Sequence, residues 1–158
     1  MQAAGTKRAQ KTWTLLLVED NPADQFMIQA AFREAGVQCQ WRVIENGTDA
    51  MRIAESSVEA VKPDLILLDW QLPGATGLEV LATLKQDSKW ASTPVIMLTG
   101  MRSAFHVNAA RRAGAYDVLE KPMQLDEWLS ILRESTEHSP QLSALLHSRN
   151  PSDDFKRA

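Results

Sequence analysis

The sequence contains one cysteine, Cys39, among 158 residues, so no disulfide can form within the chain. No apolar run approaches the roughly 20 residues that a transmembrane helix needs. The apolar residues 15–18 are followed at once by two acidic residues, which is too early for the apolar region of a signal peptide. These absences favour a protein of a reducing compartment, so we expect a cytoplasmic location and no membrane partner.

The chain also lacks a strong excess of charge, internal repeats and low-complexity blocks. Its formal net charge of -3 gives no general attraction to nucleic acid. The length fits one domain, which we place at residues 13–137, after a disordered arm at residues 1–12. Residues 138–158 form a short C-terminal extension, too small for a DNA-binding output domain, so we expect no direct contact with nucleic acid.

The chain is organised around residues 63–74, where four apolar residues, 65–68, run directly into Asp69. A short apolar run bounded by proline and glycine is typical of a strand buried on both faces of a parallel sheet. Ligands of open α/β sheets bind outside the carboxyl ends of the strands. Taken alone, this stretch leaves Asp69 equally open to a functional role and to a simple turn-capping role.

Strand and helix patterns alternate along the whole domain. Apolar runs predict strands at residues 13–18, 41–44, 65–68, 95–98 and 116–119. Helical spacing of apolar residues follows each run, beginning after Pro22, Asn46, Gly77, Gly100 and Pro122. This alternation predicts a parallel sheet with helices on both faces, a three-layer sandwich.

The predicted strands end in a recurring set of polar residues. Glu19 and Asp20 follow the first strand, Asp69 the third, Thr99 the fourth and Lys121 the fifth. Each alone could be an ordinary solvated or turn residue. Together at one edge, the carboxylates would repel one another without a cation, and hard oxygen ligands suit Mg²⁺. Asp69 could then be the nucleophile that forms an aspartyl phosphate, with Thr99 and Lys121 holding the phosphoryl oxygens.

These motifs, in this order, resemble the receiver domain of two-component response regulators: Val-Glu-Asp-Asn at 18–21, Leu-Asp at 68–69 with Leu-Pro-Gly at 72–74, Leu-Thr-Gly at 98–100 and Glu-Lys-Pro at 120–122. The resemblance implies a flavodoxin-like (βα)5 sheet with strand order 2-1-3-4-5. It also implies Mg²⁺-dependent transfer of a phosphoryl group to Asp69 from the phosphohistidine of a histidine kinase or a phosphotransfer protein. By the same analogy Asp20, Asp69 and the backbone carbonyl of Gln71 bind the metal, and Glu19 acts mostly through water.

The sequence departs from the family pattern at two positions. Val118 stands three residues before the lysine, where receivers usually carry a switch aromatic, and Tyr116 lies about 6–7 Å away along the strand. We therefore expect the aromatic switch to be absent rather than replaced by Tyr116. Trp70, directly after the acceptor, could line the site or pack under a helix, and we favour packing.

We expect a stand-alone receiver, of the kind found with phytochrome-type kinases, that signals by phosphorylation-biased dimerisation or partner docking. By family analogy the face comprises the fourth helix, fifth strand and fifth helix. Its candidate residues are Arg111, Arg112, Tyr116, Asp117, Trp128 and the leucines of 142–146, with Trp128 at least as compatible with the core.

Three other classes are weighed against this hypothesis. A phosphatase of the haloacid-dehalogenase type would need an acid two residues after the nucleophile, where this chain has Gln71. A flavodoxin would need a phosphate-binding loop after the first strand, where residues 19–24 are acidic. A degenerate receiver would lack some of the five polar residues, all of which are present.

Overall fold

Five strands and five helices alternate in the computed structural model, which describes residues 12–56 and 62–138. The strands are β1 (Trp13–Val18), β2 (Cys39–Ile44), β3 (Leu65–Asp69), β4 (Val95–Thr99) and β5 (Asp117–Glu120). The helices are α1 (Pro22–Glu34), α2 (Gly47–Glu55), α3 (Gly77–Gln86), α4 (Ala104–Arg112) and α5 (Leu125–His138). Within these ranges no helix is both long and apolar enough for a membrane span. The predicted N-terminal arm, apart from Thr12, and the extension after residue 138 lie outside the described residues.

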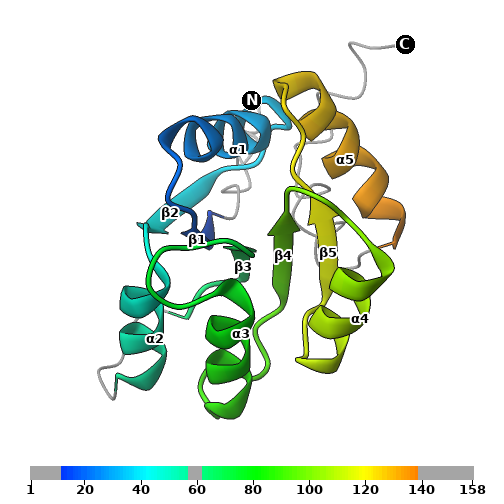
Figure 1. The fold of residues 1–158 in the computed structure, drawn as a ribbon. Coiled ribbons are helices and arrows are strands. Elements are labelled where there is room, and N and C mark those ends of the chain that lie inside the picture. Colours follow the sequence, from blue (N-terminus) through cyan, green and yellow to red (C-terminus); the bar gives the residue numbers. More distant parts are fainter. Residues whose placement is uncertain (1–11, 57–61, 139–158) are drawn as a thin grey trace, which may run out of the picture.

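All strand pairs are parallel, and the strand order is β2-β1-β3-β4-β5. Helices α1 and α5 cover one face of the sheet, and α2, α3 and α4 cover the other (Figure 1). The predicted flavodoxin-like fold and strand order are therefore confirmed. Because every strand runs in the same direction, all five carboxyl ends meet at one edge, called the carboxyl edge below.

The sheet divides the hydrophobic core into two clusters. Along β1, Leu15 and Leu17 face the α1–α5 cluster, while Leu16 and Val18 face the cluster under α2, α3 and α4. Every residue of β3 and β4 is buried, as expected for central strands covered on both faces. Burying one leucine fully stabilises the fold by about 1.5–3 kcal/mol, so these strands form a rigid support for the residues at their ends.

The starts of two strands and the position of one side chain differ from the sequence-based expectation, and β3, β4 and β5 each end one residue later than predicted. β2 begins at Cys39, two residues before Trp41, because it pairs with β1 from Trp13 onward. β5 begins one residue later than predicted, at Asp117. Trp128 was a candidate for an exposed interface as well as for the core. The interface prediction is wrong, because Trp128 is 1% exposed and packs in the α1–α5 core.

Helix caps fix the chain where it leaves the carboxyl edge. The Asn21 side chain caps α1 by accepting a hydrogen bond from the Ala23 N–H at 2.8 Å. Thr76 and Glu79 cap α3 reciprocally as a capping box. Between them, the Gly77 N–H donates to the Trp70 carbonyl at 2.9 Å, which folds the loop back behind Asp69. A side chain at Gly77 would place Cβ 2.1 Å from the Asp69 carbonyl oxygen, so this close approach requires glycine.

Candidate functional site

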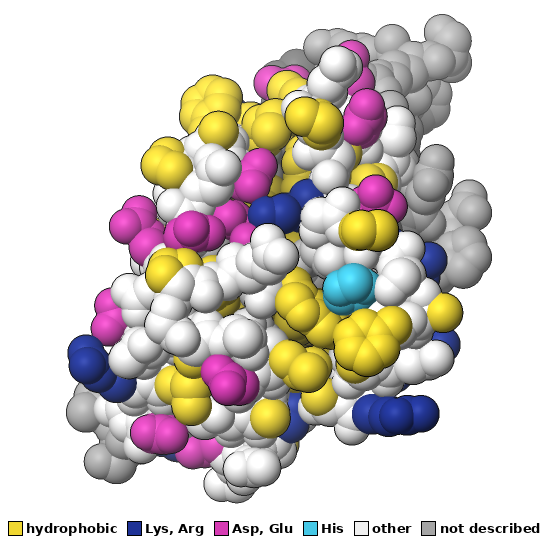
Figure 2. All heavy atoms as spheres, in the orientation of Figure 1, with side chains coloured by type: hydrophobic (Ala, Val, Ile, Leu, Met, Phe, Trp, Pro, Cys, Tyr) yellow, Lys and Arg dark blue, Asp and Glu magenta, His cyan; other side chains and the backbone are white. Residues whose placement is uncertain are grey.

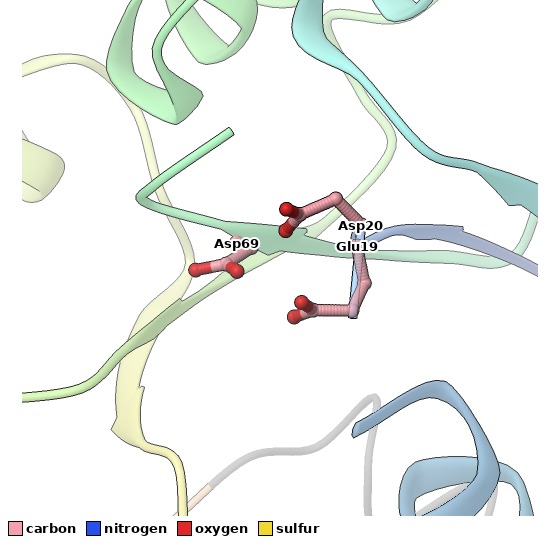
Figure 3. Close-up of side chains that lie close together, drawn as sticks. All are labelled: Glu19, Asp20 and Asp69. Carbon is pink, nitrogen blue, oxygen red and sulfur yellow. The ribbon is translucent and has the colours of Figure 1, made fainter. Parts of the chain in front are cut away.

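Three carboxylates meet at the carboxyl edge of β1 and β3. Val18 pairs with Leu68, which brings Glu19 and Asp20 beside Asp69. Each of the three offers an oxygen, and these oxygens lie within 4.8 Å of one another. Figure 3 shows the carboxylates of Glu19 and Asp20 pointing toward the Asp69 side. Glu19 and Asp69 are buried and Asp20 is exposed, so the cluster opens to solvent on the Asp20 side.

Lys121, the residue directly after β5, provides the counter-charge. Its backbone N–H donates to the Thr99 carbonyl at 2.7 Å, which fixes the chain beside β4. Its Nζ lies 2.9 Å from Asp69 Oδ2 and 3.3 Å from Glu19 Oε2. It also lies 3.1 Å from Asp24 Oδ2, a third carboxylate contact. On the molecular surface, Asp and Glu side chains gather beside Lys or Arg side chains in the middle of the face drawn in Figure 2.

Crowding of charge perturbs both kinds of ionisable group. Burial, together with the hydrogen bond to and the charge of Asp69, raises the pKa of Glu19 to about 8. Burial alone would lower the pKa of Lys121, but hydrogen bonds and charges of Asp69, Glu19 and Asp24 outweigh it and raise the pKa above its ordinary value. Lys121 therefore stays charged, while Glu19 ionises less readily than an ordinary glutamate.

The donor set fits a hard divalent cation. Carboxylate oxygens are the ligands that Mg²⁺ prefers, and Mg²⁺ commonly keeps several waters, for which the exposed side at Asp20 leaves access. The Gln71 N–H donates to Asp69 Oδ1 at 3.2 Å, so residue 71 is held next to the Asp69 carboxylate. The predicted metal residues Glu19, Asp20, Asp69 and Gln71 thus lie together at one site.

Thr99 lies at the end of β4 with its hydroxyl engaged locally. It is 3% exposed; Oγ1 donates to the Met101 carbonyl at 3.0 Å and accepts from the Met101 N–H at 3.3 Å. Rotation of this hydroxyl toward a group on Asp69 would release both hydrogen bonds to Met101. The loop after β4 is therefore coupled to any ligand that takes the Thr99 hydroxyl.

Sequence reasoning did not assign Asp24 to the site. The residue lies in the first turn of α1, and its side chain is 20% exposed beside Lys121. Its signal was present: the Asn21-Pro22 start of α1 predicts that a residue two positions after the proline lies in the first helical turn. That turn begins three residues after Glu19 and so lies close to the carboxyl edge.

Val118 and Tyr116 have different surroundings. Val118 is 1% exposed and packs in the cluster under α2, α3 and α4. Tyr116 is 37% exposed, and its N–H donates to the carbonyl of Val95, the first residue of β4. Val95 and Thr99 are at opposite ends of β4, about 13 Å apart at 3.3 Å per residue. Tyr116 therefore lies at the end of the sheet away from Thr99.

Trp70 packs under the helices, the role that we favoured for it. Its half-buried ring packs against the cluster under α2, α3 and α4 and lies edge-on to His106 of α4, with ring centroids 4.8 Å apart. The His106 Nδ1 lies 2.6 Å from the hydroxyl of Ser103, the α4 N-cap. The residue after Asp69 therefore contacts a side chain in the first turn of α4.

Two side chains occupy the outer edge of β5. The Arg102 Nε donates to the Val118 carbonyl at 3.0 Å, and the Val118 N–H donates to Asp117 Oδ1 at 2.7 Å. Both backbone groups of Val118 are thus satisfied by side chains rather than by another strand. Arg102 belongs to the same loop as Met101.

Cys39 has no part in this site. It is half-buried against the α1–α5 core, and burial raises its thiol pKa to about 12, which disfavours the nucleophilic thiolate.

Comparisons with known proteins place this geometry in context. The response regulator receiver domain family matches residues 15–133. The phosphate regulon transcriptional regulatory protein PhoB of Pseudomonas aeruginosa is 35% identical over 120 residues, which are 76% of this chain. The chain spans 50% of PhoB, about half its length.

Two solved structures of about 30% identity have similar folds. The phosphorylated cyanobacterial phytochrome response regulator RcpA superimposes with a TM-score of 0.71 at 30% identity, covering 80% of this chain and 93% of that one. The receiver domain of a Pseudomonas aeruginosa sensor histidine kinase has a TM-score of 0.63 at 30% identity, covering 78% and 97%. That structure has a magnesium ion coordinated in its active-site cleft.

Proposed function

Because this chain belongs to the response regulator receiver domain family of two-component systems, we propose that Asp69 accepts a phosphoryl group from a partner's phosphohistidine, with Mg²⁺ bound beside it. The observation that supports this most directly is the position of Asp69: it ends the buried central strand, 2.9 Å from Lys121 and within 4.8 Å of two more carboxylates. A carboxylate held between cationic partners is a suitable nucleophile for phosphoryl transfer.

The transfer needs one bond to form and one to break. An oxygen of Asp69 forms the new O–P bond, the donor's N–P bond breaks, and its electron pair returns to the imidazole. The Asp69 carboxylate charge is converted to an acyl phosphate, so the charge that the site must stabilise moves onto the phosphoryl oxygens. Hydrolysis of that acyl phosphate by water returns Asp69 and inorganic phosphate, which makes the signal reversible.

Each site residue has a distinct role. Asp20, Asp69, the Gln71 carbonyl and, through water, Glu19 would hold Mg²⁺, which screens the carboxylates from the incoming phosphoryl group. Lys121 pairs with Asp69 before transfer and with a phosphoryl oxygen afterwards. Thr99 contributes its hydroxyl to another phosphoryl oxygen.

We place the signalling output on the face formed by α4, β5 and α5. Arg111 and Arg112 are exposed there, and the loop from Thr99 to Arg102 joins this face to the site. Occupancy of Asp69 would shift the population of this loop and so bias dimerisation or docking of a partner. Sizing chromatography with and without beryllium trifluoride, a phosphoryl mimic, should show a shift; a monomer in both conditions would remove the dimer version.

The donor is a histidine kinase or phosphotransfer protein, and the similarity to RcpA makes a phytochrome-type kinase the first to test. The family membership argues against the dehalogenase-type phosphatase and the flavodoxin, and the assembled site argues against a degenerate scaffold.

The decisive experiment is incubation with radiolabelled acetyl phosphate and MgCl₂. We expect an acid-stable, base-labile label that disappears in Asp69→Asn and when the metal is chelated. An unlabelled wild type, or equal label on Asp69→Asn, would refute the proposal.

A further inference from the structure

Asp24 is a carboxylate at the site that the proposed chemistry has not yet used. Its Oδ2 lies 3.1 Å from Lys121 Nζ, as close as the other ion pairs of that ammonium. It reaches the lysine from α1, whereas the other two carboxylates come from the ends of β1 and β3. Lys121 is therefore held from two directions, by the sheet and by a helix.

The three partners of Lys121 differ in what happens to them during the reaction. Glu19 and Asp69 belong to the cluster whose oxygens lie within 4.8 Å of one another and suit a metal ion. Mg²⁺ would draw their charge toward itself, and Asp69 also loses its carboxylate charge when it becomes an acyl phosphate. Among the described residues that contact Nζ, Asp24 alone neither belongs to the metal cluster nor receives the phosphoryl group.

We propose that Asp24 is the positioning residue for Lys121. The inference rests on the proposed phosphoryl transfer to Asp69. Asp24 keeps the Lys121 ammonium beside Asp69 when the metal and the phosphoryl group weaken its ion pairs with Glu19 and Asp69. Three ammonium hydrogens allow Lys121 to retain Asp24 and still donate to a phosphoryl oxygen. The side chain of Asp24 is 80% covered, so this charge-assisted hydrogen bond is partly shielded from solvent.

A purely local role for Asp24 must be separated from this one. As an acid in the first turn of α1 it also interacts favourably with the helix dipole, and its N–H lies 3.4 Å from the capping Asn21 oxygen. Asp126 is a matched control, because it is an exposed acid in the first turn of α5. Asp126→Asn removes the same charge from the first turn of another helix, and Asp126 is not among the ion-pair partners of Lys121.

The test compares wild type, Asp24→Asn, Asp24→Glu and Asp126→Asn in single-turnover labelling with acetyl phosphate at saturating MgCl₂. Loss of one charge-assisted contact should slow phosphorylation of Asp24→Asn about tenfold, which corresponds to ~1.4 kcal/mol. Asp24→Glu, which keeps the charge, should recover most of the rate. Asp126→Asn should match wild type. The Mg²⁺ dissociation constant of Asp24→Asn, measured by calorimetry, should stay within about threefold of wild type, since Asp24 lies outside the metal cluster.

Each other outcome overturns the positioning role. An unchanged phosphorylation rate in Asp24→Asn would show that Asp24 is dispensable. A faster rate would show that Asp24 holds Lys121 away from the phosphoryl group. A rate loss shared by Asp126→Asn, or one that Asp24→Glu does not relieve, would indicate a helix or packing effect. A rate loss matched by weaker Mg²⁺ binding would assign Asp24 to the metal instead. Wild type that takes no label would refute the proposed function itself, which is a different result from labelled wild type with an unaffected Asp24→Asn.

Discussion

Raising the pH from 6 to 8 should tighten Mg²⁺ binding at the carboxylate cluster. The perturbation acts on Glu19, whose pKa burial and the neighbouring Asp69 raise to about 8. Below that pH the metal-free site holds a proton on Glu19, and the carboxylate can supply its charge to the metal only after this proton leaves. Lys121, whose pKa is raised, stays charged throughout the interval and does not contribute to the change.

The size of the effect follows from the Glu19 pKa. Each pH unit below a pKa of about 8 weakens apparent metal affinity roughly tenfold when the metal needs the ionised form. Between pH 6 and 8 the apparent dissociation constant should therefore fall about 50-fold, and above pH 9 it should become constant. At pH 7 binding of one Mg²⁺ should release close to one proton.

Isothermal titration calorimetry in two buffers of different ionisation enthalpy measures both quantities. Glu19→Gln, which cannot ionise there, should bind more weakly at pH 8 but show little change between pH 6 and 8. A wild-type dissociation constant that varies less than about threefold over this interval, with no proton released, would refute the assignment of the bound proton to Glu19.

The same group sets the pH dependence of folding without metal. Glu19 has a higher pKa in the folded chain than the ordinary 4.5, so the folded state binds more protons between pH 4.5 and about 8. The stability contribution is fully present below pH 4.5 and is lost as the pH rises through about 8. Urea denaturation at pH 6 and pH 8 in EDTA should show this loss, and its absence in Glu19→Gln would confirm the source.

Two substitutions test the supports of the site. Gly77→Ala should reduce the free energy of unfolding, measured by urea denaturation, by about 1–3 kcal/mol, because its Cβ would lie 2.1 Å from the Asp69 carbonyl oxygen. Gly100→Ala is the matched control. Its Cβ meets nothing within 4 Å, so the free energy of unfolding should change little. Lys121→Met should destabilise the metal-free protein by about 1–3 kcal/mol by leaving the carboxylates of Asp69 and Asp24 unpaired, and added Mg²⁺ should recover part of the loss in a thermal melt. Arg52→Gln, which removes a cation with a 75% exposed side chain, should stay within about 0.5 kcal/mol, and an equal loss there would contradict the role of buried charge.

Much of the fold and site could be predicted because the informative residues sit at the ends of buried strands. The apolar runs of β3 and β4 marked central strands, and parallel pairing then required Asp69, Thr99 and Lys121 to share an edge. The same reasoning placed Glu19 and Asp20 beside Asp69, and the structure brings them there.

The remaining features depend on side-chain reach, which strand order does not determine. Asp24 contacts Lys121 because α1 begins close to the carboxyl edge, which brings its first turn beside the lysine. Trp128 could face solvent or core on a helix whose pattern allows both, and the depth of the α1–α5 cluster decides for the core. The contact between Trp70 and His106 depends likewise on where α4 begins.

The side chain of Arg102 occupies part of the outer edge of the sheet at β5. An outer strand with unpaired backbone groups is a template for another strand, and β5 presents Val118 there. Its carbonyl accepts a hydrogen bond from the side chain of Arg102, which lies on the loop after Thr99. A change of the Arg102 rotamer would therefore leave the Val118 carbonyl without this hydrogen bond while the sheet itself stays intact. The hydrogen bond that occupies this edge of the sheet therefore comes from the same short loop that begins at Thr99 of the site.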